Sequence, residues 1–495
     1  MRMTITNWQY FGAVVGACNV GRLIWWIRRD LRIEDNDTLA AALTDATEVL
    51  PVFILDDRLL VSQRLRGARV AWMLDGLRAL DADLRRHGSA LIVRRGEPTT
   101  ELLALCRAEG VEGVYFQRDY GPFAMERDRQ VASILDLAGV RVRTFGDLVI
   151  HEAGEVLTGP GKPYGIYSPF RRKWLARAKP PVGPRDLPLD RLGGLRQSRS
   201  LAIPTATDLG VTAAPNPIVP AGEANARLRL DAFMAGPIWN YEEQRNRPDV
   251  AGTSILSPYL RWGMVSPREC YWAAIQARDN APDEAGRRGI DSWLGELIWR
   301  EFFYQILAAY PGSAHHNFRR KYDAIAWENR PDWLEAWSEG RTGYPIVDAG
   351  MRQLNETGWM HNRVRLIVAS FFCKDLLLDW RLGEAVFRRR LLDGDLASNV
   401  GNWQWSAGTG TDAAPYFRIL NPTAQSERFD PKGSYIRRWV PELADVPNDL
   451  IHEPHRMTIE QQRQARCTIG QDYPHPIVDH AVQRARALAM YGAAR

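Results

Sequence analysis

The chain has 495 residues, a hydrophobic fraction of 45%, a charged fraction of 25% and a formal net charge of +5 at pH 7. This composition is typical of a globular protein with two or three domains, and the small net charge excludes a protein that coats nucleic acid by charge alone. The five cysteines are dispersed without a CxxC pair and no apolar run reaches roughly 18 residues, which predicts a cytoplasmic protein without a disulfide framework, metal site or membrane span.

The first part of the chain shows short apolar runs separated by helical patterns. Residues 1–20 precede the first run, and we expect them to form a disordered extension. The runs are candidates for strands that are buried on both faces, and they lie at residues 23–27, 49–55, 90–93, 113–116 and 140–145. A helical pattern over residues 64–86 follows the second run. Strands that alternate with helices predict a doubly wound parallel sheet over residues 21–151.

The turn after the first predicted strand has no GxGxxG fingerprint, and no GxxxxGK[ST] motif occurs in the chain. The predicted sheet therefore does not hold a dinucleotide or a nucleoside triphosphate in the usual way. Its carboxyl edge remains suited to a small ligand at a topological switch point.

Two further regions follow along the chain. Residues 152–225 are rich in proline and glycine, which predicts an interdomain linker. Residues 226–495 carry apolar residues at 3.6-residue spacing and no strand pattern, which predicts an all-helical domain. The predicted fold class is therefore α/β plus all-α.

The stretch Asp393–Gln425 combines acidic groups, amide side chains and the two tryptophans Trp403 and Trp405. Its Gly-Thr repeats and its Ala-Pro and Asn-Pro pairs predict mostly irregular backbone, and long irregular segments inside compact domains are usually functional. The alternative is a polar loop that two aromatic side chains anchor. We favour a functional segment because two bulky tryptophans are an unusual choice for a simple connection.

The predicted helix 291–310 carries a mixed charged and aromatic face. Glu296, Trp299, Arg300 and Phe303 fall at i, i+3, i+4 and i+7, so their side chains share one side of the helix. Lone charges are costly to bury, so this face indicates a site rather than a core stripe. The alternative is an exposed ion pair between Glu296 and Arg300, worth a few tenths of a kcal/mol.

Two other segments offer charged or hydrogen-bonding groups. Asn362 lies at a helix start, where it can serve as the N-cap, and Arg365 needs a carboxylate partner if it is buried, either Asp393 or Asp395. The segment Gly252–Leu260 offers hydroxyl and backbone N–H groups to a phosphate, although Ser and Thr are also common as simple caps. Together these groups suit a flat, polyanionic ligand better than a hydrolytic reaction.

The chain contains several long, ordered strings, which are LIWWIRRDLRIEDN, GTSILSPYLRWGMVSPR, ELIWREFF, GYPIVDAGMRQL, TGWMHNRVR, DGDLASNVGNWQW, PYFRILNP and YPHPIVDHAVQRAR. These strings resemble the photolyase/cryptochrome family, and among its branches the class I cyclobutane pyrimidine dimer (CPD) DNA photolyases. The resemblance covers nearly the whole chain outside the first twenty residues and the linker. It implies an N-terminal antenna domain, a C-terminal helical FAD domain, and a lyase that splits pyrimidine dimers in DNA by electron transfer from photoexcited, reduced, anionic FAD.

By position, the resemblance implies that thirteen residues contact or frame FAD. They are Tyr241, Thr253, Ser254, Ile255, Leu256, Ser257, Trp293, Arg300, Arg365, Asp393, Gly394, Asp395 and Asn399. It further implies that Arg365 pairs with Asp393 and that Asn399 faces the flavin N5. An amide cannot donate a proton as an acid does, so Asn399 is suited to the anionic reduced flavin.

The resemblance also implies a DNA side and an electron path. Glu296 would hydrogen-bond the dimer, and Trp299 and Trp405 would flank it. The other residues implied on the DNA side are Arg245, Asn362, Arg363, Leu366, Arg418 and Gln425. The tryptophans at the positions of the family's photoreduction chain are Trp403, Trp380 and Trp327, for which the alternative is a purely structural role in the core. With Glu296 and Asn399, these three tryptophans are the expected catalytic set.

The remaining expectations concern the antenna chromophore, the oligomeric state and the competing functions. Folate-type relatives carry an Asn-Glu pair after the strand that ends near Phe116, where this chain has Gln117 and Arg118. This change argues against methenyltetrahydrofolate and favours 8-hydroxy-5-deazaflavin or a flavin, with an empty site as a further alternative. We expect a monomer that acts on UV-damaged DNA. The alternatives are a cryptochrome photoreceptor with the same fold and FAD but no repair, and a non-catalytic nucleic-acid-binding protein.

Overall fold

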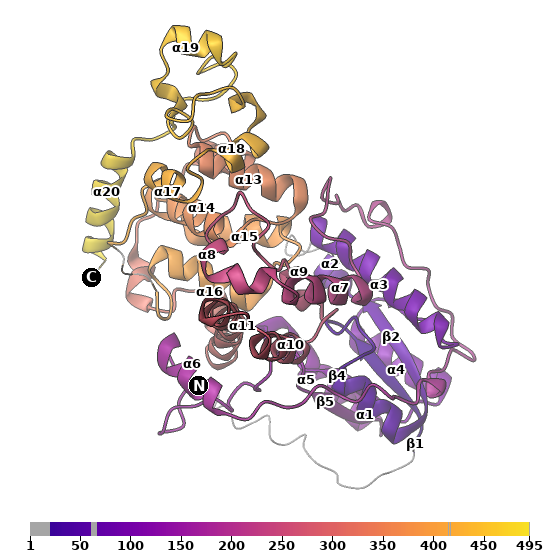
Figure 1. Ribbon diagram of the computed structural model, residues 1–495. Helices are drawn as coiled ribbons and strands as arrows, with labels where there is room; N and C mark the ends of the chain where they lie inside the picture. Colours follow the sequence, from indigo (N-terminus) through magenta and orange to yellow (C-terminus); the bar gives the residue numbers. More distant parts are fainter. Residues whose placement is uncertain (1–19, 61–66, 414, 416, 495) are drawn as a thin grey trace.

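The computed structural model describes residues 20–60, 67–413, 415 and 417–494 (Figure 1). The prediction of a disordered extension over residues 1–20 falls almost entirely outside the described residues. A parallel sheet with its helices forms one part of the molecule, and a larger helical part lies beside it.

The five predicted strands are confirmed as one parallel sheet in the order β3-β2-β1-β4-β5. The strands are β1 (Val20–Ile27), β2 (Ala46–Leu55), β3 (Ile92–Arg95), β4 (Gly113–Gln117) and β5 (Arg141–Phe145). Alternate side chains of β1 enter different hydrophobic layers, with Leu23 and Trp25 in one and Ile24 and Trp26 in the other. This burial on both faces explains the continuous apolar runs in the sequence.

Helices cover both faces of the sheet. They are α1 (Asp37–Asp45), α2 (Asp57–Leu60), α3 (Ala68–Arg86), α4 (Pro98–Glu109) and α5 (Pro122–Leu137). The layer with Trp25 includes Leu74 and Leu77 of α3, whereas the layer with Trp26 includes residues of α4 and α5. The predicted α/β architecture is thereby confirmed.

The second half of the chain is helical, as predicted. Its helices are α7 (Glu223–Met234), α8 (Tyr241–Gln244), α9 (Ser257–Trp262), α10 (Pro267–Asp279), α11 (Glu284–Ala309), α12 (Pro331–Glu339), α13 (Pro345–Thr357), α14 (Asn362–Lys374), α15 (Trp380–Arg390), α16 (Leu396–Ala407), α17 (Pro422–Phe429), α18 (Ser434–Trp439), α19 (Ile459–Gln464) and α20 (His480–Ala493). A buried cluster of side chains from α13, α14, α15 and α16 forms much of its core.

The predicted linker contains a helix that its proline and glycine content concealed. Helix α6 (Tyr167–Ala176) packs on α11, with Phe170 and Trp174 buried between them. The indole of Trp174 donates to the carboxylate of Glu301 at 2.6 Å, which fixes the helix on its neighbour.

The expectation of mostly irregular backbone in Asp393–Gln425 is wrong for its first half. Helix α16 begins after Asp395, whose side chain accepts a hydrogen bond from the Ser398 amide and caps the helix. Leu396, Val400 and Trp403 fall at helical spacing, so one face of α16 packs into the core. This apolar spacing was present in the sequence beneath the polar residues.

The two parts of the molecule meet at the segment that follows β1. The Leu31 amide donates to the carbonyl of Trp262 at 3.1 Å. A Cβ atom at Gly263 would lie 1.9 Å from the Arg29 carbonyl oxygen, so this close approach requires glycine, and φ of Gly263 is +64°. The carboxyl end of β1 therefore lies directly against α9.

Candidate active site

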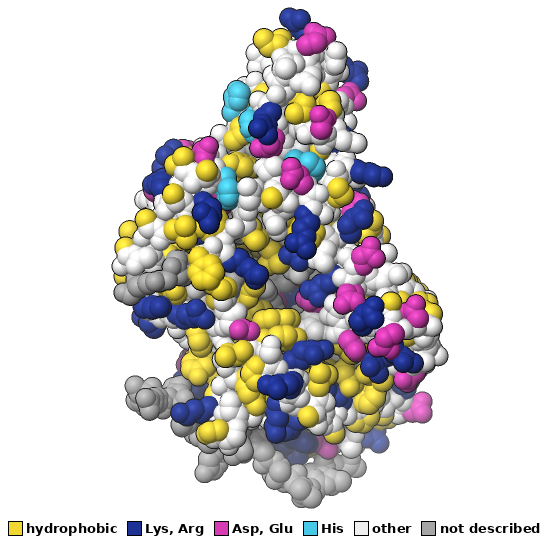
Figure 2. All heavy atoms as spheres, turned by 60° about the vertical axis from the view of Figure 1, so that its left-hand side comes forward, with side chains coloured by type: hydrophobic (Ala, Val, Ile, Leu, Met, Phe, Trp, Pro, Cys, Tyr) yellow, Lys and Arg dark blue, Asp and Glu magenta, His cyan; other side chains and the backbone are white. Residues whose placement is uncertain are grey.

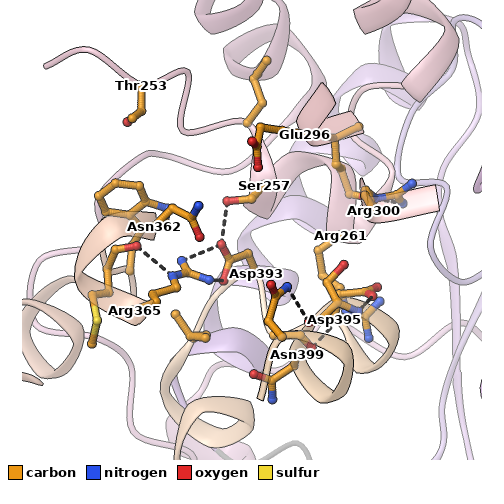
Figure 3. A pocket seen from close by; sticks show the side chains of 18 of the residues that line it. Thr253, Ser257, Arg261, Glu296, Arg300, Asn362, Arg365, Asp393, Asp395 and Asn399 are labelled. Atoms are coloured by element: carbon orange, nitrogen blue, oxygen red, sulfur yellow. Dashed lines mark hydrogen bonds and ion pairs between the residues drawn. The ribbon is translucent and has the colours of Figure 1, made fainter. Parts of the chain in front are cut away.

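A cavity opens in the helical part between α9, α11, α14 and α16 (Figure 3). All thirteen residues that the family resemblance implies for FAD line it. Four more of the predicted site residues also line it, namely Glu296, Asn362, Leu366 and Trp403. The fold thus gathers segments that are far apart in the sequence around one space.

The segment from Thr253 to Ser257 forms one wall of the cavity. The Arg229 guanidinium donates to the carbonyls of Ser254 (2.7 Å) and Thr253 (3.2 Å), which fixes this turn. Helix α9 begins at Ser257, but the Ser257 hydroxyl donates to Asp393 at 2.5 Å instead of capping the helix. The simple-cap alternative for this serine is therefore wrong.

The predicted ion pair between Arg365 and Asp393 is confirmed. Arg365 Nη2 and Nη1 donate to Asp393 Oδ2 and Oδ1 at 2.8 and 3.1 Å, and Figure 3 shows Ser257 and Arg365 directed at the same carboxylate. The N-cap of α14 is His361, whose Nδ1 accepts from the Arg363 amide at 3.2 Å. The N-cap prediction for Asn362 is wrong because the helix starts one residue earlier, which leaves the Asn362 side chain exposed at the cavity.

Asp395 connects the cavity to the α/β part. Its Oδ2 accepts from Arg29 Nη2 at 2.6 Å and from the Tyr304 hydroxyl. Burial tends to raise the pKa of Asp395, but the positive charges of Arg29, Arg261 and Arg300 hold that pKa well below its usual range. Asp395 is therefore an anion whose position is fixed by hydrogen bonds from Arg29, Tyr304 and the Ser398 amide.

Two hydrogen-bond donors of the cavity lining have no partner among the described residues. Arg261 Nη1 is buried and has no hydrogen-bond partner among the described residues, and burial together with the charge of Arg29 lowers the pKa of Arg261 to about 10. The Nε1 of Trp403 is a second buried donor without a partner in the described part of the chain. Unpaired buried donors are costly, so this wall fits an anionic ligand that accepts hydrogen bonds.

Asn399 is held by Glu384 of α15. Its amide nitrogen donates to Glu384 Oε1 at 2.9 Å and to the Glu384 carbonyl at 3.2 Å. The amide nitrogen is thus engaged away from the cavity, and Oδ1 is left as the acceptor of this side chain. Asn399 can accept a hydrogen bond at the cavity but cannot supply an acidic proton.

Glu296 does not pair with Arg300. It accepts from Arg245 Nη2 at 2.5 Å, whereas Arg300 Nη1 donates to the Leu148 carbonyl at 2.7 Å. The alternative of an exposed i,i+4 pair on α11 is therefore wrong. Burial raises the pKa of Glu296 and Arg245 opposes that rise, so a hydrogen-bonding carboxyl group sits at the rim of the cavity.

The other predicted DNA-side residues lie outside the cavity lining. Trp299 is half-buried and stacks on Tyr167, with ring centroids 3.7 Å apart and planes at 7°. Arg363 Nη2 donates to Asn246 at 2.5 Å. Three more residues lie outside the cavity lining, namely the half-buried Trp405 and Gln425 and the exposed Arg418.

Of the three predicted relay tryptophans, Trp403 lines the cavity and the other two lie in the core or against it. Trp403 and Trp380 belong to one buried cluster, and Trp327 packs against it with its side chain half-buried. A Cβ atom at Gly383, one turn after Trp380, would lie 2.2 Å from the Trp403 ring, so glycine permits α15 to approach that indole closely. The arrangement suits electron transfer, and it also suits simple core packing.

A second cavity lies at the carboxyl ends of β1 and β2, beside the point between β1 and β4 where the strand order reverses. Arg28 and Arg127 lie over the Trp26 ring at 4.6 and 5.1 Å in its wall. Trp262 Nε1 and Arg388 Nε are buried there without a partner among the described residues. Two residues, Arg261 and Gly394, line both cavities, so they form part of the wall between them.

Sequence reasoning missed several side chains that hold the site. Arg261 lies one turn after Ser257, and this spacing could have indicated it. Arg29 and Glu384 had no local signal, because each meets its partner only through the tertiary fold. The Tyr167 ring was hidden in the segment predicted as a linker.

The described part of the chain shows neither a candidate metal-binding cluster nor a candidate membrane span. It contains no group of three or more His, Cys, Asp or Glu side chains arranged to hold a metal ion. None of its helices combines the length and the apolar character that a membrane span requires.

Comparisons with known proteins agree with this geometry. Residues 23–188 match the family model for DNA photolyase, and residues 293–493 match the FAD binding domain of DNA photolyase. The deoxyribodipyrimidine photo-lyase of Halobacterium salinarum is 44% identical over 483 residues, which cover 95% of this chain and 99% of that protein. The chain belongs to the photolyase/cryptochrome family.

Solved structures lead to the same family. A class III photolyase from Agrobacterium tumefaciens superposes with a TM-score of 0.89 at 37% identity, covering 98% of this chain and 99% of that one. A photolyase from Sulfolobus tokodaii, described with two FAD molecules, gives 0.82 at 32% identity and covers 95% and 100% of the two chains. A cryptochrome from Synechocystis gives 0.87 at 27% identity and covers 96% and 99%.

Proposed function

We propose that this protein is a lyase that uses light to repair cyclobutane pyrimidine dimers in DNA. The observation that carries the proposal is the cavity itself, which combines an anion-binding wall with the Glu296 carboxyl group at its rim. The relative named above as a deoxyribodipyrimidine photo-lyase supports the same reaction.

The residues at the cavity fit the FAD that the family implies. Arg261 and Trp403 offer buried donors that the protein leaves without partners among the described residues, and Thr253 and Ser254 add hydroxyl groups. Reduced FAD, when bound, supplies the photochemistry by donating an electron to the dimer and taking it back after the ring opens. The protein binds and orients the reactants and excludes water.

Each of the polar residues at the cavity has a distinct role in this proposal. The Arg365–Asp393 pair and Asp395 would hold the cofactor. Asn399 offers an amide oxygen but no acidic proton, so it favours the anionic reduced form of the cofactor. Glu296, with its pKa raised by burial, hydrogen-bonds the dimer at the rim.

The DNA side of the proposal uses the residues around this rim. Trp299 and Trp405 flank the dimer, and stacking on aromatic rings, worth roughly 1–3 kcal/mol per base, offsets the cost of taking the dimer out of the duplex. The residues that line the strand are Arg245, Asn362, Arg363, Leu366, Arg418 and Gln425. Trp403, Trp380 and Trp327 would carry electrons toward the cofactor to restore its reduced form, and they would take no part in the repair step.

For the antenna we propose 8-hydroxy-5-deazaflavin or a flavin in the second cavity. Arg118, which stands where folate-type relatives carry a carboxylate, is engaged by Glu152 at 2.8 Å and does not offer an acceptor to a folate. The unpaired donors on Trp262 and Arg388 suit a polar aromatic ligand. Release of the bound chromophores by denaturation tests this, and methenyltetrahydrofolate in the extract would refute it.

The runner-up is a cryptochrome photoreceptor with the same fold and cofactor. Blue-light illumination of the photoreduced protein with a DNA that carries a thymine dimer separates the two functions. We expect dimers to disappear with time of illumination, and dimers that stay intact would refute repair. A purified protein without a flavin absorption band would refute both functions.

We further propose a division of the chain into an antenna domain of residues 21–151, a linker of 152–225 and a helical catalytic domain of 226–495. The sheet ends at Phe145 and the run of helices begins at Glu223, which supports these boundaries. We also propose a monomer, and we place it in the cytoplasm because the four described cysteines are free and buried.

A further inference from the structure

The charge of the chain is unevenly distributed. Between Glu155 and Asp186 there is no acidic residue, although the whole chain carries a formal net charge of only +5. The cations of this interval are Lys162, Arg171, Arg172, Lys173, Arg177, Lys179 and Arg185. Local clusters of this kind attract polyanions even when the net charge is small.

Two of these cations serve the structure of α6. Lys179 Nζ donates to the carbonyls of Trp174 and Arg177 at 2.6 Å, which satisfies the end of the helix. Arg177 lies 3.5 Å from the carboxylate of Glu155. These two charges are therefore already balanced by polar or acidic groups.

Four other cations are available at the surface. Lys162, Arg172 and Lys173 are exposed, and Arg171 is half-buried. Within the described residues none of the four forms an ion pair with a carboxylate, unlike most arginines of this protein. Their charge is thus open to a partner from outside the chain.

The start of α6 lies against the proposed dimer site. The Tyr167 ring stacks on Trp299, and its hydroxyl donates to the Gly295 carbonyl at 2.8 Å. The Tyr167 amide donates to Asp412 at 3.0 Å, and the Thr411 hydroxyl donates to the Gly165 carbonyl at 2.7 Å. These contacts hold α6 beside Thr411 and Asp412, which follow α16.

We propose that residues 158–173, the α6 arm, bind the phosphate backbone of the DNA that flanks the dimer. The proposal rests on the proposed repair function, and it adds a surface from the predicted linker to the DNA side of the helical part. The charge of the arm is complementary to DNA and continuous with the proposed DNA side. Figure 2, in which the side of the molecule with α6 comes forward, shows lysine and arginine side chains above and below a hollow in the middle of the face.

The α6 arm would hold the DNA backbone beside the dimer, which the reaction requires. Taking a dimer out of the stack costs a few kcal/mol, and the flanking backbone must be held while that cost is met. Exposed lysine and arginine side chains make such contacts without reading the sequence, which suits an enzyme that finds lesions anywhere in DNA. An acidic protein partner would use the same charge, but the contact of Tyr167 with Trp299 places the arm at the lesion and favours DNA.

The test uses the double variant Arg172→Ala/Lys173→Ala in the full chain with its flavin. Arg107→Ala is the control, because Arg107 is an exposed cation on α4, on the other side of the molecule in Figure 1. Binding is measured between 50 and 200 mM salt to a 30-base-pair duplex with one thymine dimer and to a UV-irradiated thymidine pentanucleotide. Flavin absorbance of each variant confirms that the helical part is intact.

We expect the double variant to lower the salt slope of duplex binding by about 2, because each of the two cations neutralises one phosphate in the wild type. Over a fourfold change in salt, the wild type then loses about 16-fold more affinity than the double variant. Pentanucleotide binding should stay unchanged, because so short a strand cannot span both the dimer site and the arm. Arg107→Ala should keep the slope of the wild type.

An unchanged duplex slope in the double variant would overturn the proposal, and so would an equal loss for the pentanucleotide or for the control. If the duplex slope is unchanged but the variant no longer binds an acidic protein partner, the arm is a protein-binding surface instead. Repair is scored separately by illumination of the wild type with the pentanucleotide. Dimers that stay intact in that assay would refute the repair function, but the binding measurements would still test whether the α6 arm contacts DNA.

Discussion

Arg29 reaches from the end of β1 into the wall of the proposed flavin site, and its replacement by methionine tests how far the α/β part supports that site. Methionine keeps much of the aliphatic stem but removes the hydrogen bonds that Arg29 donates to Asp395 (2.6 Å) and Asp119 (3.3 Å). Arg29 is only 8% exposed, so water cannot replace these hydrogen bonds fully.

Removing one partner of a buried ion pair costs about 3–5 kcal/mol, because the other charge stays buried. Arg261 and Arg300 remain near Asp395, so we expect Arg29→Met to lower the free energy of unfolding by about 3 kcal/mol, the lower end of that range. This corresponds to about 150-fold in the unfolding equilibrium. Urea unfolding followed by the fluorescence of released flavin measures the change.

The effect of Arg29→Met should depend on pH with a defined sign. The folded-state pKa of Asp395 lies well below its usual range, and Arg29 and Arg261 lower the pKa of Asp119 to about 2 against the opposing effect of burial. Groups with depressed folded pKa values stabilise the protein above the unfolded pKa, about 3.9 for Asp, and this stability is lost as the pH falls through the folded pKa. The difference between wild type and variant should therefore be full at neutral pH and shrink below about pH 4.

The control is Arg85→Met on α3. Arg85 pairs with Asp81 at 2.8 Å, but its side chain is 65% exposed, and exposed pairs of this kind contribute about 0.2–1 kcal/mol. A loss for Arg29→Met no larger than that of the control would refute the reasoning. A loss that does not change between pH 7 and pH 3 would show that charge on Asp395 and Asp119 is not the cause.

Three further substitutions test separate parts of the site. Asp393→Ala leaves Arg365 and Ser257 without their acceptor, at a cost of about 1–3 kcal/mol in FAD affinity, whereas Asp393→Asn keeps an acceptor and should lose less in the same titration of apoprotein with FAD. Trp380→Phe should slow photoreduction under blue light but leave repair by chemically pre-reduced protein nearly unchanged, and a large loss of that repair would contradict the separation of roles. Tyr167→Leu removes the stack on Trp299, worth about 0.5–1.5 kcal/mol, so binding of dimer-containing DNA should weaken about 2- to 12-fold. Tyr167→Phe keeps the ring and removes only the hydroxyl bond to Gly295, so it should lose less binding than Tyr167→Leu.

The sheet was predictable because its strands are buried on both faces. Leu23 to Ile27 form a continuous apolar run, and runs of this kind separated by helical patterns allow few architectures. The residues lining the flavin cavity were predictable by position within family-specific strings. The charge argument narrowed the partner of Arg365 to Asp393 or Asp395, and the family resemblance selected Asp393, which the structure confirms.

Other parts of the site depend on contacts that no local pattern records. Arg29 and Asp395 are 366 positions apart, and Arg245 and Glu296 meet only because α8 packs on α11. The wrong expectation for α16 has a different cause, because glycine and polar residues masked the apolar spacing of Leu396, Val400 and Trp403. The same masking by proline and glycine concealed α6.

The proposed division of the chain into an antenna domain, a linker and a catalytic domain is not a division of the site. Arg29, which follows β1, binds the Asp395 carboxylate that caps α16. Tyr167 of the predicted linker stacks on one face of the Trp299 ring. The helical part alone would keep the residues that line the cavity but would lose the supports of two of its walls. Because a site misplaced by about 1 Å can lose a hundredfold in rate, these supports belong to the machinery of repair as much as the lining itself.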